Sequence, residues 1–275
     1  MRSGPPLSSQ QYKPVRGLSR GLAVLEALNR APGGTASITE IARASAMHRT
    51  TVKRLLETLR AGGFVRHADR DGQYHLTFEV RRLSEGFADE AWVSEVAGPR
   101  MREAVARLAW PCDLGTAEAG AMVVRESTHR WSILSQHRQM VGERLPMLVT
   151  AMGRVYLAAC GDTEREGLLE MLRGRDDRWA ALARDGAYVE RVLRETRERG
   201  YGYNDGEWIR EPDFAAVAVP VRAGRRLLAA INLVFPKSAV PRADLATRYV
   251  PDLLRLARAI GRDSRPLLAA GRVNR

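Results

Sequence analysis

The sequence is poor in the residues that build redox and membrane-embedded sites. It has only two cysteines, Cys112 and Cys160, and they are far apart and fit no metal-binding or redox spacing. Both are expected to be ordinary core residues of a protein in a reducing cytoplasm. No apolar run reaches the roughly 18 residues of a membrane-spanning helix, and the N-terminus lacks the apolar segment of a signal peptide. We therefore expect a cytoplasmic protein with no membrane partner.

The sequence also lacks the motifs that would indicate an enzyme. It contains no P-loop, no nucleophile elbow and no glycine-rich dinucleotide fingerprint. His129 and His137 have no third ligand near them in the sequence, so they predict no metal site. Asp176 and Asp177 are interpreted as solvated charges of a loop. We expect no catalytic residues, no metal and no cofactor.

What the sequence has in excess is positive charge. Among 275 residues, 44 lysines and arginines outnumber 32 aspartates and glutamates, and the formal net charge is +12. Residues 43–66 hold six of these basic side chains against one acidic side chain, Glu57. The net positive charge per residue is about fivefold higher there than in the whole chain, as expected of a surface that neutralises DNA phosphates.

The basic stretch also has the pattern of two helices joined by a short turn. Ser37 and Glu40 have the spacing of a capping box, which predicts a helix start. Residues 44–47 form a short connection, and a second helix is predicted over residues 48–61. Apolar residues of the second helix recur at the spacing of one helical face. They are Val52, Leu55, Leu56 and Leu59.

A hairpin is predicted directly after the second helix. Gly62-Gly63 is expected to end the helix as a left-handed cap. Residues 64–66 and 73–76 are predicted strands, and residues 69–72 form the turn between them. Together with a preceding helix at residues 17–29, this order predicts a winged helix-turn-helix. The preceding helix has an apolar stripe of Leu18, Leu22, Leu25 and Leu28. The alternative is a solvated basic helix in some other small domain.

Three segments give the chain a resemblance to a known family. They are residues 19–22, 38–42 and 48–59, which are similar to the signature of IclR-type bacterial transcription regulators. Later segments extend the similarity over nearly the whole chain. Within the family, the chain resembles activators of 3-(3-hydroxyphenyl)propionate catabolism. The segments behind this narrower resemblance are residues 48–51, 80–87 and 144–146.

The resemblance implies that the second helix enters the major groove of double-stranded operator DNA. Arg49 and Thr50, in its first turn, are expected to read base edges, and Arg54 and Arg66 to contact phosphates. The full set of candidate DNA-binding residues is Thr39, His48, Arg49, Thr50, Thr51, Lys53, Arg54 and Arg66.

A linker helix is predicted at residues 77–93, after the DNA-binding domain of residues 15–76. Val80, Leu83 and Phe87 form a narrow apolar seam on an otherwise charged helix, which favours pairing with a second chain. The resemblance likewise implies dimers that pair into tetramers. The alternative is a connector packed on its own domain. An arm at residues 1–14 is predicted to be disordered.

The remainder, residues 94–262, is predicted to be a mixed α/β effector domain followed by a tail at residues 263–275. The expected strands are residues 112–117, 121–126, 131–134, 200–204, 215–221 and 227–234. The expected helices are residues 96–108, 147–159, 163–172, 188–199 and 242–261. This order indicates an antiparallel sheet with helices on one or both faces, which resembles the GAF-like effector domain of the family. The predicted fold class is therefore α+β.

The resemblance further implies a small-molecule effector site between the sheet and the helix after Leu145-Pro146. The residues implied are Leu145, Met147, Thr150, Met152, Gly153, Ala216, Asn232 and Val234. Asn232 also stands out by itself, because it is a polar side chain in an apolar strand. The alternative is that Asn232 caps a backbone group or faces solvent. The chain departs from the family pattern at Arg154, where lysine is usual, and at residues 232–235, which are more apolar than usual.

These observations predict a homo-oligomeric transcription regulator of a catabolic operon that responds to a small effector, an aromatic carboxylic acid by resemblance. If it activates transcription, RNA polymerase is a further partner. One rival hypothesis is a constitutive repressor or DNA-architectural protein whose C-terminal domain only assembles the oligomer. A second rival is an enzyme fused to a winged helix.

Overall fold

The computed structural model describes residues 15–68, 70–83, 91–135, 140–208, 210 and 212–270. The predicted N-terminal arm, residues 1–14, lies outside the described residues. The chain divides into two compact units, Met1–Ala88 and Asp89–Arg275, and each is treated by itself below. Within the described part of the chain, none of the helices combines the length and the apolar character needed to cross a membrane.

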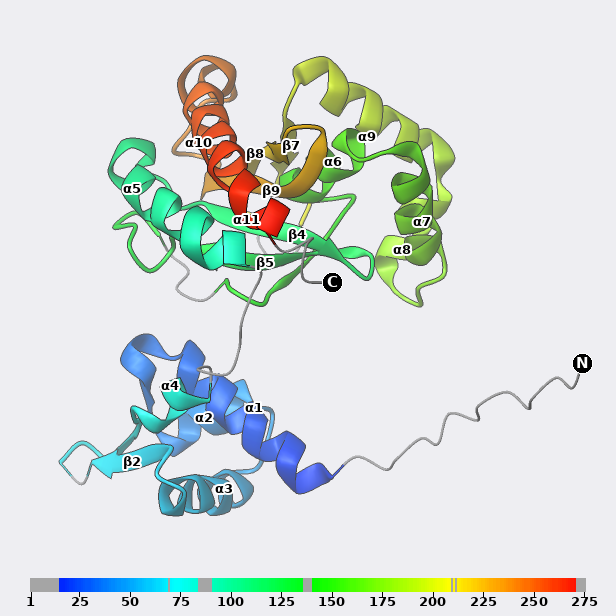
Figure 1. Cartoon of the computed structure of the whole chain (residues 1–275). Coiled ribbons are helices and arrows are strands. Elements are labelled where there is room, and N and C mark those ends of the chain that lie inside the picture. Colours follow the sequence, from blue (N-terminus) through cyan, green and yellow to red (C-terminus); the bar gives the residue numbers. More distant parts are fainter. Residues whose placement is uncertain are drawn as a thin grey trace, which may run out of the picture. The chain divides into compact units, whose positions relative to one another are not determined.

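The N-terminal unit is a winged helix-turn-helix, as predicted (Figure 1). Its elements are α1 (Arg16–Arg30), η1 (Pro32–Gly34), β1 (Thr35–Ala36), α2 (Ile38–Ala44), α3 (Arg49–Ala61), β2 (Val65–Ala68), β3 (Gln73–Leu76) and α4 (Glu79–Arg82). The three strands form an antiparallel sheet in the order β1-β3-β2. The short strand β1 was not predicted.

Local interactions explain where these helices begin and end. The capping box at α2 is confirmed, since the backbone N–H of Ser37 donates to Glu40 at 2.8 Å and that of Glu40 donates to Ser37 at 3.3 Å. After α3 the left-handed residue is Gly63, with φ of +80°, whereas Gly62 keeps a right-handed conformation. The glycine pair therefore ends the helix as predicted, but only Gly63 needs the glycine backbone.

The core of this unit contains Val24, Leu28, Ala36, Ile41, Ala42, Val52, Leu56, Val65 and Tyr74. The predicted stripe on α1 is wrong in its first half. Leu18 and Leu22 are 64% and 50% exposed, while Val24 is fully buried. The first turns of α1 extend beyond the elements that cover its C-terminal half, so their leucines have no core to enter.

The C-terminal unit is a six-stranded antiparallel sheet in the order β6-β5-β4-β9-β8-β7. The strands are β4 (Asp113–Glu118), β5 (Ala121–Ser127), β6 (Arg144–Pro146), β7 (Gly202–Asp205), β8 (Phe214–Ala223) and β9 (Arg226–Pro236). The helices are η2 (Val93–Ala97), α5 (Gly98–Leu108), α6 (Ala151–Ala159), α7 (Asp162–Arg173), α8 (Arg178–Arg184), α9 (Gly186–Arg199), η3 (Arg242–Asp244), η4 (Leu245–Tyr249), α10 (Val250–Asp263) and α11 (Arg265–Ala270).

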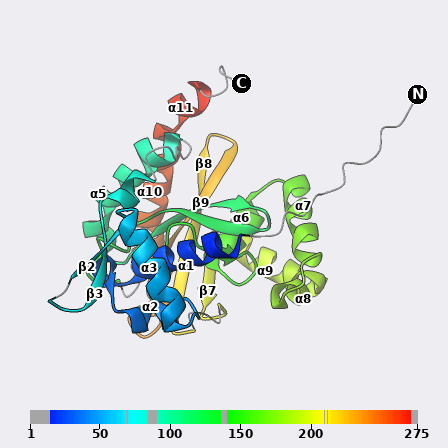
Figure 2. The same ribbon diagram turned by 90° about the horizontal axis from the view of Figure 1, so that it is seen from below.

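Helices cover both faces of this sheet (Figure 2). Strands β8 and β9 alternate between the two faces, so Ile231 and Leu233 pack into the core with α5 and α10. Ala216, Ala218 and Ala230 face the other core, which contains α6 and α9. Both strands therefore have nearly continuous apolar sequences, as predicted for strands buried on both sides.

Several predictions for the C-terminal unit are wrong in detail. Residues 131–134 form a turn instead of a strand, because the carbonyl of Thr128 accepts hydrogen bonds from the N–H groups of Trp131 and Ser132. Residues 144–146 pair with β5, and the following helix starts at Ala151, four residues later than predicted. Helix α8 was not predicted; the Asp177 carboxylate caps it by accepting from the N–H groups of Trp179 and Ala180.

The ends of the two units also differ from the predicted boundaries. Of the predicted linker helix, residues 79–82 form α4, residues 84–90 lie outside the described residues and Val93 begins η2. Residues 265–270, assigned to a tail, form α11, and its Leu267 and Leu268 pack against the core.

Candidate DNA-binding surface and effector pocket

The N-terminal turn of α3 presents a row of solvent-exposed polar side chains. His48 is the N-cap, and its Nδ1 lies 2.8 Å from the Thr50 hydroxyl and 3.5 Å from the Thr50 N–H. Seven of the eight predicted DNA-binding residues are exposed, and Thr51 is half-buried. Since Val52 and Leu56 point into the core, the helix holds its cationic face outward.

The charge on this face is not cancelled within the unit. Glu57, the single acidic residue of the basic stretch, pairs with Arg60 at 2.6 Å. The hydrogen bonds from Arg60 and then Tyr74 lower the pKa of the Glu57 carboxyl below its usual value. Among the described residues no carboxylate forms a salt bridge with Arg49, Lys53 or Arg54, so these cations remain available for phosphates.

The hairpin is attached to α3 by a buried tyrosine. Tyr74 of β3 is 2% exposed, and its hydroxyl donates to the second carboxylate oxygen of Glu57 at 3.1 Å. Burial, followed by the neighbouring Glu57, raises the pKa of Tyr74 above its usual value. Arg66 lies exposed on the adjacent strand β2. The hairpin is thus held against α3 by a hydrogen bond to Glu57 as well as by the core that the two elements share.

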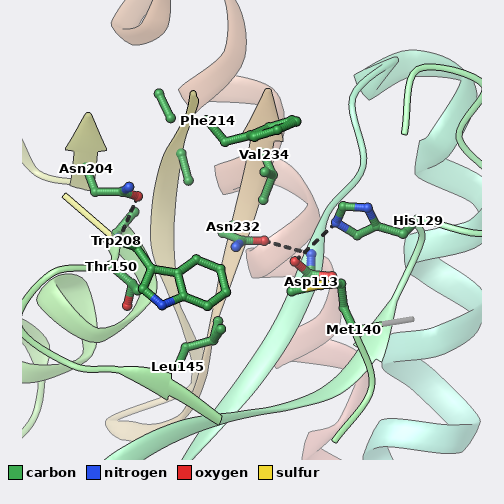
Figure 3. Close-up of a pocket in the computed structure, with 13 residues that line it drawn as sticks. Asp113, His129, Met140, Leu145, Thr150, Asn204, Trp208, Phe214, Asn232 and Val234 are labelled. Atoms are coloured by element: carbon green, nitrogen blue, oxygen red, sulfur yellow. Dashed lines mark hydrogen bonds and ion pairs between the residues drawn. The ribbon is translucent and has the colours of Figure 1, made fainter. Parts of the chain in front are cut away.

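The C-terminal unit contains a pocket between the sheet and the N-terminus of α6 (Figure 3). It encloses about 530 Å³ of empty space, counting its open mouth. The described residues that line it are Asp113, His129, Met140, Leu145, Thr150, Ala151, Asn204, Trp208, Phe214, Ala215, Ala216, Asn232 and Val234. The small side chains of alanines on the strands leave room for the cavity, and Trp208 and Phe214 add aromatic surface to its lining.

Asn232 and Asp113 lie side by side on one wall of the pocket. They occupy neighbouring strands, β9 and β4, and the Asp113 N–H donates to the Asn232 Oδ1 at 2.8 Å. Both side chains are buried, at 5% and 0% exposure. The Asp113 Oδ2 lies 3.5 Å from the Nε2 of His129, whose Nδ1 is 2.6 Å from the Ser135 hydroxyl. Asn232 therefore caps a backbone group and also lines the pocket.

The opposite wall is formed by the start of α6. Thr150 is the N-cap; its hydroxyl donates to the Pro146 carbonyl at 2.7 Å and accepts from the Gly153 N–H at 3.2 Å. The Ala151 N–H donates to the Asn204 Oδ1 at 3.2 Å. The hydrogen of the Thr150 hydroxyl and the Gly153 N–H are thus already engaged inside the protein.

The structure brings together five of the eight predicted effector residues: Leu145, Thr150, Ala216, Asn232 and Val234. Met147, Met152 and Gly153 do not line the pocket. Met147 and Met152 are core residues, and a Cβ on Gly153 would meet the Met147 backbone at 2.2 Å. Arg154 is also structural, because its guanidinium donates to the carbonyls of Leu148 and Tyr203.

Sequence reasoning did not assign Asp113 or His129 to the effector site, although both line the pocket, and it considered His129 only as a metal ligand. Asp113 had one available signal, since it is an acid inside the predicted apolar strand 112–117. His129 carries no sequence signal for a place in this pocket. It lies in a turn after β5, and only the folding of the chain brings it beside the other lining residues. Within the described part of the chain, no group of three or more His, Cys, Asp or Glu side chains is placed to hold a metal ion.

Comparison with known families agrees with both halves of this description. The IclR helix-turn-helix domain matches residues 17–69, and the bacterial transcriptional regulator IclR C-terminal domain matches residues 87–262. The second match alone spans more than half of the chain. The chain belongs to the IclR family. As an IclR-family protein it is a DNA-binding transcriptional regulator.

Individual relatives cover nearly the whole chain. The Pca regulon regulatory protein of Pseudomonas putida is 30% identical over 246 residues, covering 88% of this chain and 81% of the relative. The HTH-type transcriptional regulator XynR of Escherichia coli K12 is 27% identical over 252 residues, covering 90% of this chain and 98% of XynR. Among solved structures, the transcriptional regulator RHA06195 from Rhodococcus sp. RHA1 is 25% identical and has a TM-score of 0.59. The match covers 91% of this chain and 98% of that protein. These relatives are named as regulators, not as enzymes.

Proposed function

We propose that this IclR-family regulator binds operator DNA through the exposed face of α3 and controls a catabolic operon in response to a small aromatic acid. It would act in the cytoplasm, where bacterial operator DNA is. The observation that carries the DNA-binding part is the uncancelled charge of Arg49, Lys53 and Arg54 on a helix whose opposite face is buried. Arg49 and Thr50 are proposed to read bases, since they occupy the first turn.

Thr39, His48, Thr51 and Lys53 are proposed to support this contact, and Arg54 and Arg66 to bind phosphates. All but Thr51 are exposed. The His48 ring has a second role, because it caps the helix that carries the other contacts. Phosphate contacts of this kind fix orientation and register, while base contacts select the sequence.

A homo-oligomeric assembly is supported by apolar side chains that the monomer leaves in solvent. Leu18 and Leu22 of α1, Phe78 and Leu83 are all at least half exposed. Large apolar side chains that lie in water are suited to contact with a second copy of the chain. We propose that these residues help pair the DNA-binding units, as dimers that further associate into tetramers.

The effector part rests on the pocket of the C-terminal unit. Its apolar lining of Leu145, Trp208, Phe214 and Val234 can enclose one ring, and a few polar groups suffice to orient it. The similarity to a protein named for the Pca regulon supports a catabolic operon. A hydroxyphenylpropionate-like acid is proposed from the resemblance of residues 48–51, 80–87 and 144–146 to activators of that pathway.

Footprinting of the full-length protein on promoters adjacent to its own gene tests this proposal. We expect protection of two half-sites and a change in protection when a hydroxyphenylpropionate is added. Protection that no effector alters would favour a constitutive repressor or architectural protein. The absence of any protected site on those promoters would contradict the proposed operon.

A further inference from the structure

The wall of the effector pocket carries an acceptor that the protein itself does not satisfy. Asp113 has no exposed surface, and within the described part of the chain neither of its carboxylate oxygens receives a hydrogen bond. The Nε2 of His129 lies 3.5 Å from the Asp113 Oδ2 without forming a hydrogen bond to it. A buried carboxylate accepts hydrogen bonds only, and a donor within hydrogen-bond distance stabilises it strongly.

A donor lies next to this acceptor. Because the Asn232 Oδ1 is held by the Asp113 N–H, the amide orientation of Asn232 is set and its Nδ2 donor must point elsewhere. Figure 3 shows that nitrogen on the side of the side chain that faces Trp208, inside the pocket. The wall therefore offers an acceptor and a donor side by side, from strands β4 and β9.

The same wall is unsuited to a carboxylate. No Lys or Arg is among the described lining residues, and an anionic group beside Asp113 would meet a like charge in a poorly solvated site. The carboxylate of an aromatic acid would have to lie away from Asp113. The start of α6 does not offer the ligand carboxylate the donors of Thr150 and Gly153 either. The Gly153 N–H already donates to the Thr150 hydroxyl, which itself donates to the Pro146 carbonyl.

We infer that the effector is a phenol-type aromatic whose hydroxyl binds between Asp113 and Asn232. A hydroxyl both donates and accepts, so it can give its proton to the carboxylate and receive the Asn232 N–H at the same oxygen. The neighbouring Trp208, Phe214 and Val234 supply the apolar surface for the ring. This inference rests on the proposed effector function and adds to it the site, Asp113 and Asn232, that binds the ring hydroxyl of the acid.

Calorimetric titration of the full chain with matched probes tests the inference. The probes are 2-, 3- and 4-hydroxyphenylpropionate, their methoxy counterparts and unsubstituted 3-phenylpropionate. A hydrogen bond to a charged group predicts that one hydroxy isomer binds about 10- to 100-fold more tightly than its methoxy and unsubstituted analogues. Equal affinities across the series, or no binding by any probe, would overturn the inference. Footprinting without ligand measures operator binding separately. A failure of the proposed DNA-binding function can therefore be told apart from a failure of this inference.

Two variants assign the preference to Asp113. Asp113→Asn should lose most of the hydroxyl preference, and Asp113→Leu should favour the unsubstituted acid. Thr196→Val is the matched control, because Thr196 is also buried, its hydroxyl donates to the Val192 carbonyl on α9 and it is not among the described residues that line the pocket. It should keep the full preference. If both Asp113 variants fold and keep the preference, the inference is wrong; if neither folds, the wild-type comparison of hydroxy and methoxy probes decides alone.

Discussion

Arg49 is the residue whose role follows most directly from its surroundings. Its guanidinium is exposed at the first position of α3, and no described carboxylate pairs with it. A planar group with five donors is suited to a guanine edge in the major groove, which is read by bidentate hydrogen bonds. Arg66, on the hairpin, has the same charge but lies on a strand instead of the helix that would enter the groove.

Arg49→Ala is therefore expected to cost about 1–3 kcal/mol of binding free energy and to relax sequence preference at one operator position. Competition binding with single-base operator variants measures both effects. Arg66→Ala is the control and should weaken all operator variants alike, because a phosphate contact carries no sequence information. Unchanged affinity and preference in Arg49→Ala would remove this residue from the readout.

The two thiols are structural, as expected from the sequence. Burial raises the pKa of Cys112 to about 12 and that of Cys160 to about 11. At pH 8 both are almost entirely protonated, and the thiolate is the reactive form. We expect iodoacetamide to leave both unmodified in the folded protein and to modify both in denaturant, as read by mass spectrometry. Rapid labelling of the folded protein would show that one of these sites opens.

For single residues, the sequence predicted burial or exposure only where the local spacing of apolar residues determines it. Exposure of the α3 face was predictable, because the apolar spacing of Val52 and Leu56 fixes which side is buried. Asn232 was predictable as an anomaly, but its bond to Asp113 was not, since the two residues are 119 positions apart. The pocket wall arises from the pairing of β4 with β9, which no local pattern contains.

Helix α2 shows how much a single cap contributes at the scale of an element. It has only seven residues, so few of its backbone N–H groups find partners inside the helix. Ser37→Ala removes the side chain that accepts from the Glu40 N–H and should lower the free energy of unfolding by about 1 kcal/mol. Chemical denaturation followed by circular dichroism measures the change. Ser37→Asp, which can still cap, should stay near wild type.

The segment around α4 is the element that we propose for pairing with a second chain. Leu83 is 62% exposed, whereas Val80 is half-buried, and Phe87 lies outside the described residues. Leu83→Asp should abolish tight operator binding while leaving the C-terminal unit folded, because a charge in an apolar seam is poorly solvated. Gel-shift and thermal unfolding measurements report these two outcomes separately.

Met171→Asp is a suitable control for that substitution. Met171 is 49% exposed on α7, in the other unit, and has no proposed partner. The same change of charge there should leave operator binding intact. A Leu83→Asp protein that still protects two half-sites would show that this seam does not pair the chains.

Elements with strong periodicity or caps were predictable, and short elements were not. Helices α3, α7 and α9 and strands β8 and β9 lie within a few residues of their predicted bounds. Strands β1 and β6 have two and three residues, too few to show an alternation, and exist because β3 and β5 offer free edges. Helix α6 starts late because Thr150, not Pro146, supplies its cap.

At the scale of the whole molecule, the two units suit different tasks. One has a small core under an exposed cationic helix, and the other has a two-sided sheet with a lined pocket. The pocket lies between the start of α6 and the sheet of the C-terminal unit. A ligand alters DNA binding only if it favours one arrangement of the protein over another, because equal affinity for both shifts nothing.

The most direct test of this account is the operator affinity of the full chain with and without a bound phenol-type acid, measured by fluorescence anisotropy. Allosteric coupling of typical size predicts a shift of at least about 5-fold in the wild type. Ala216→Phe places a ring in the pocket opposite Val234, so it should bind the operator but show no shift. An affinity that the acid leaves unchanged in the wild type, or shifts equally in Ala216→Phe, would contradict the account.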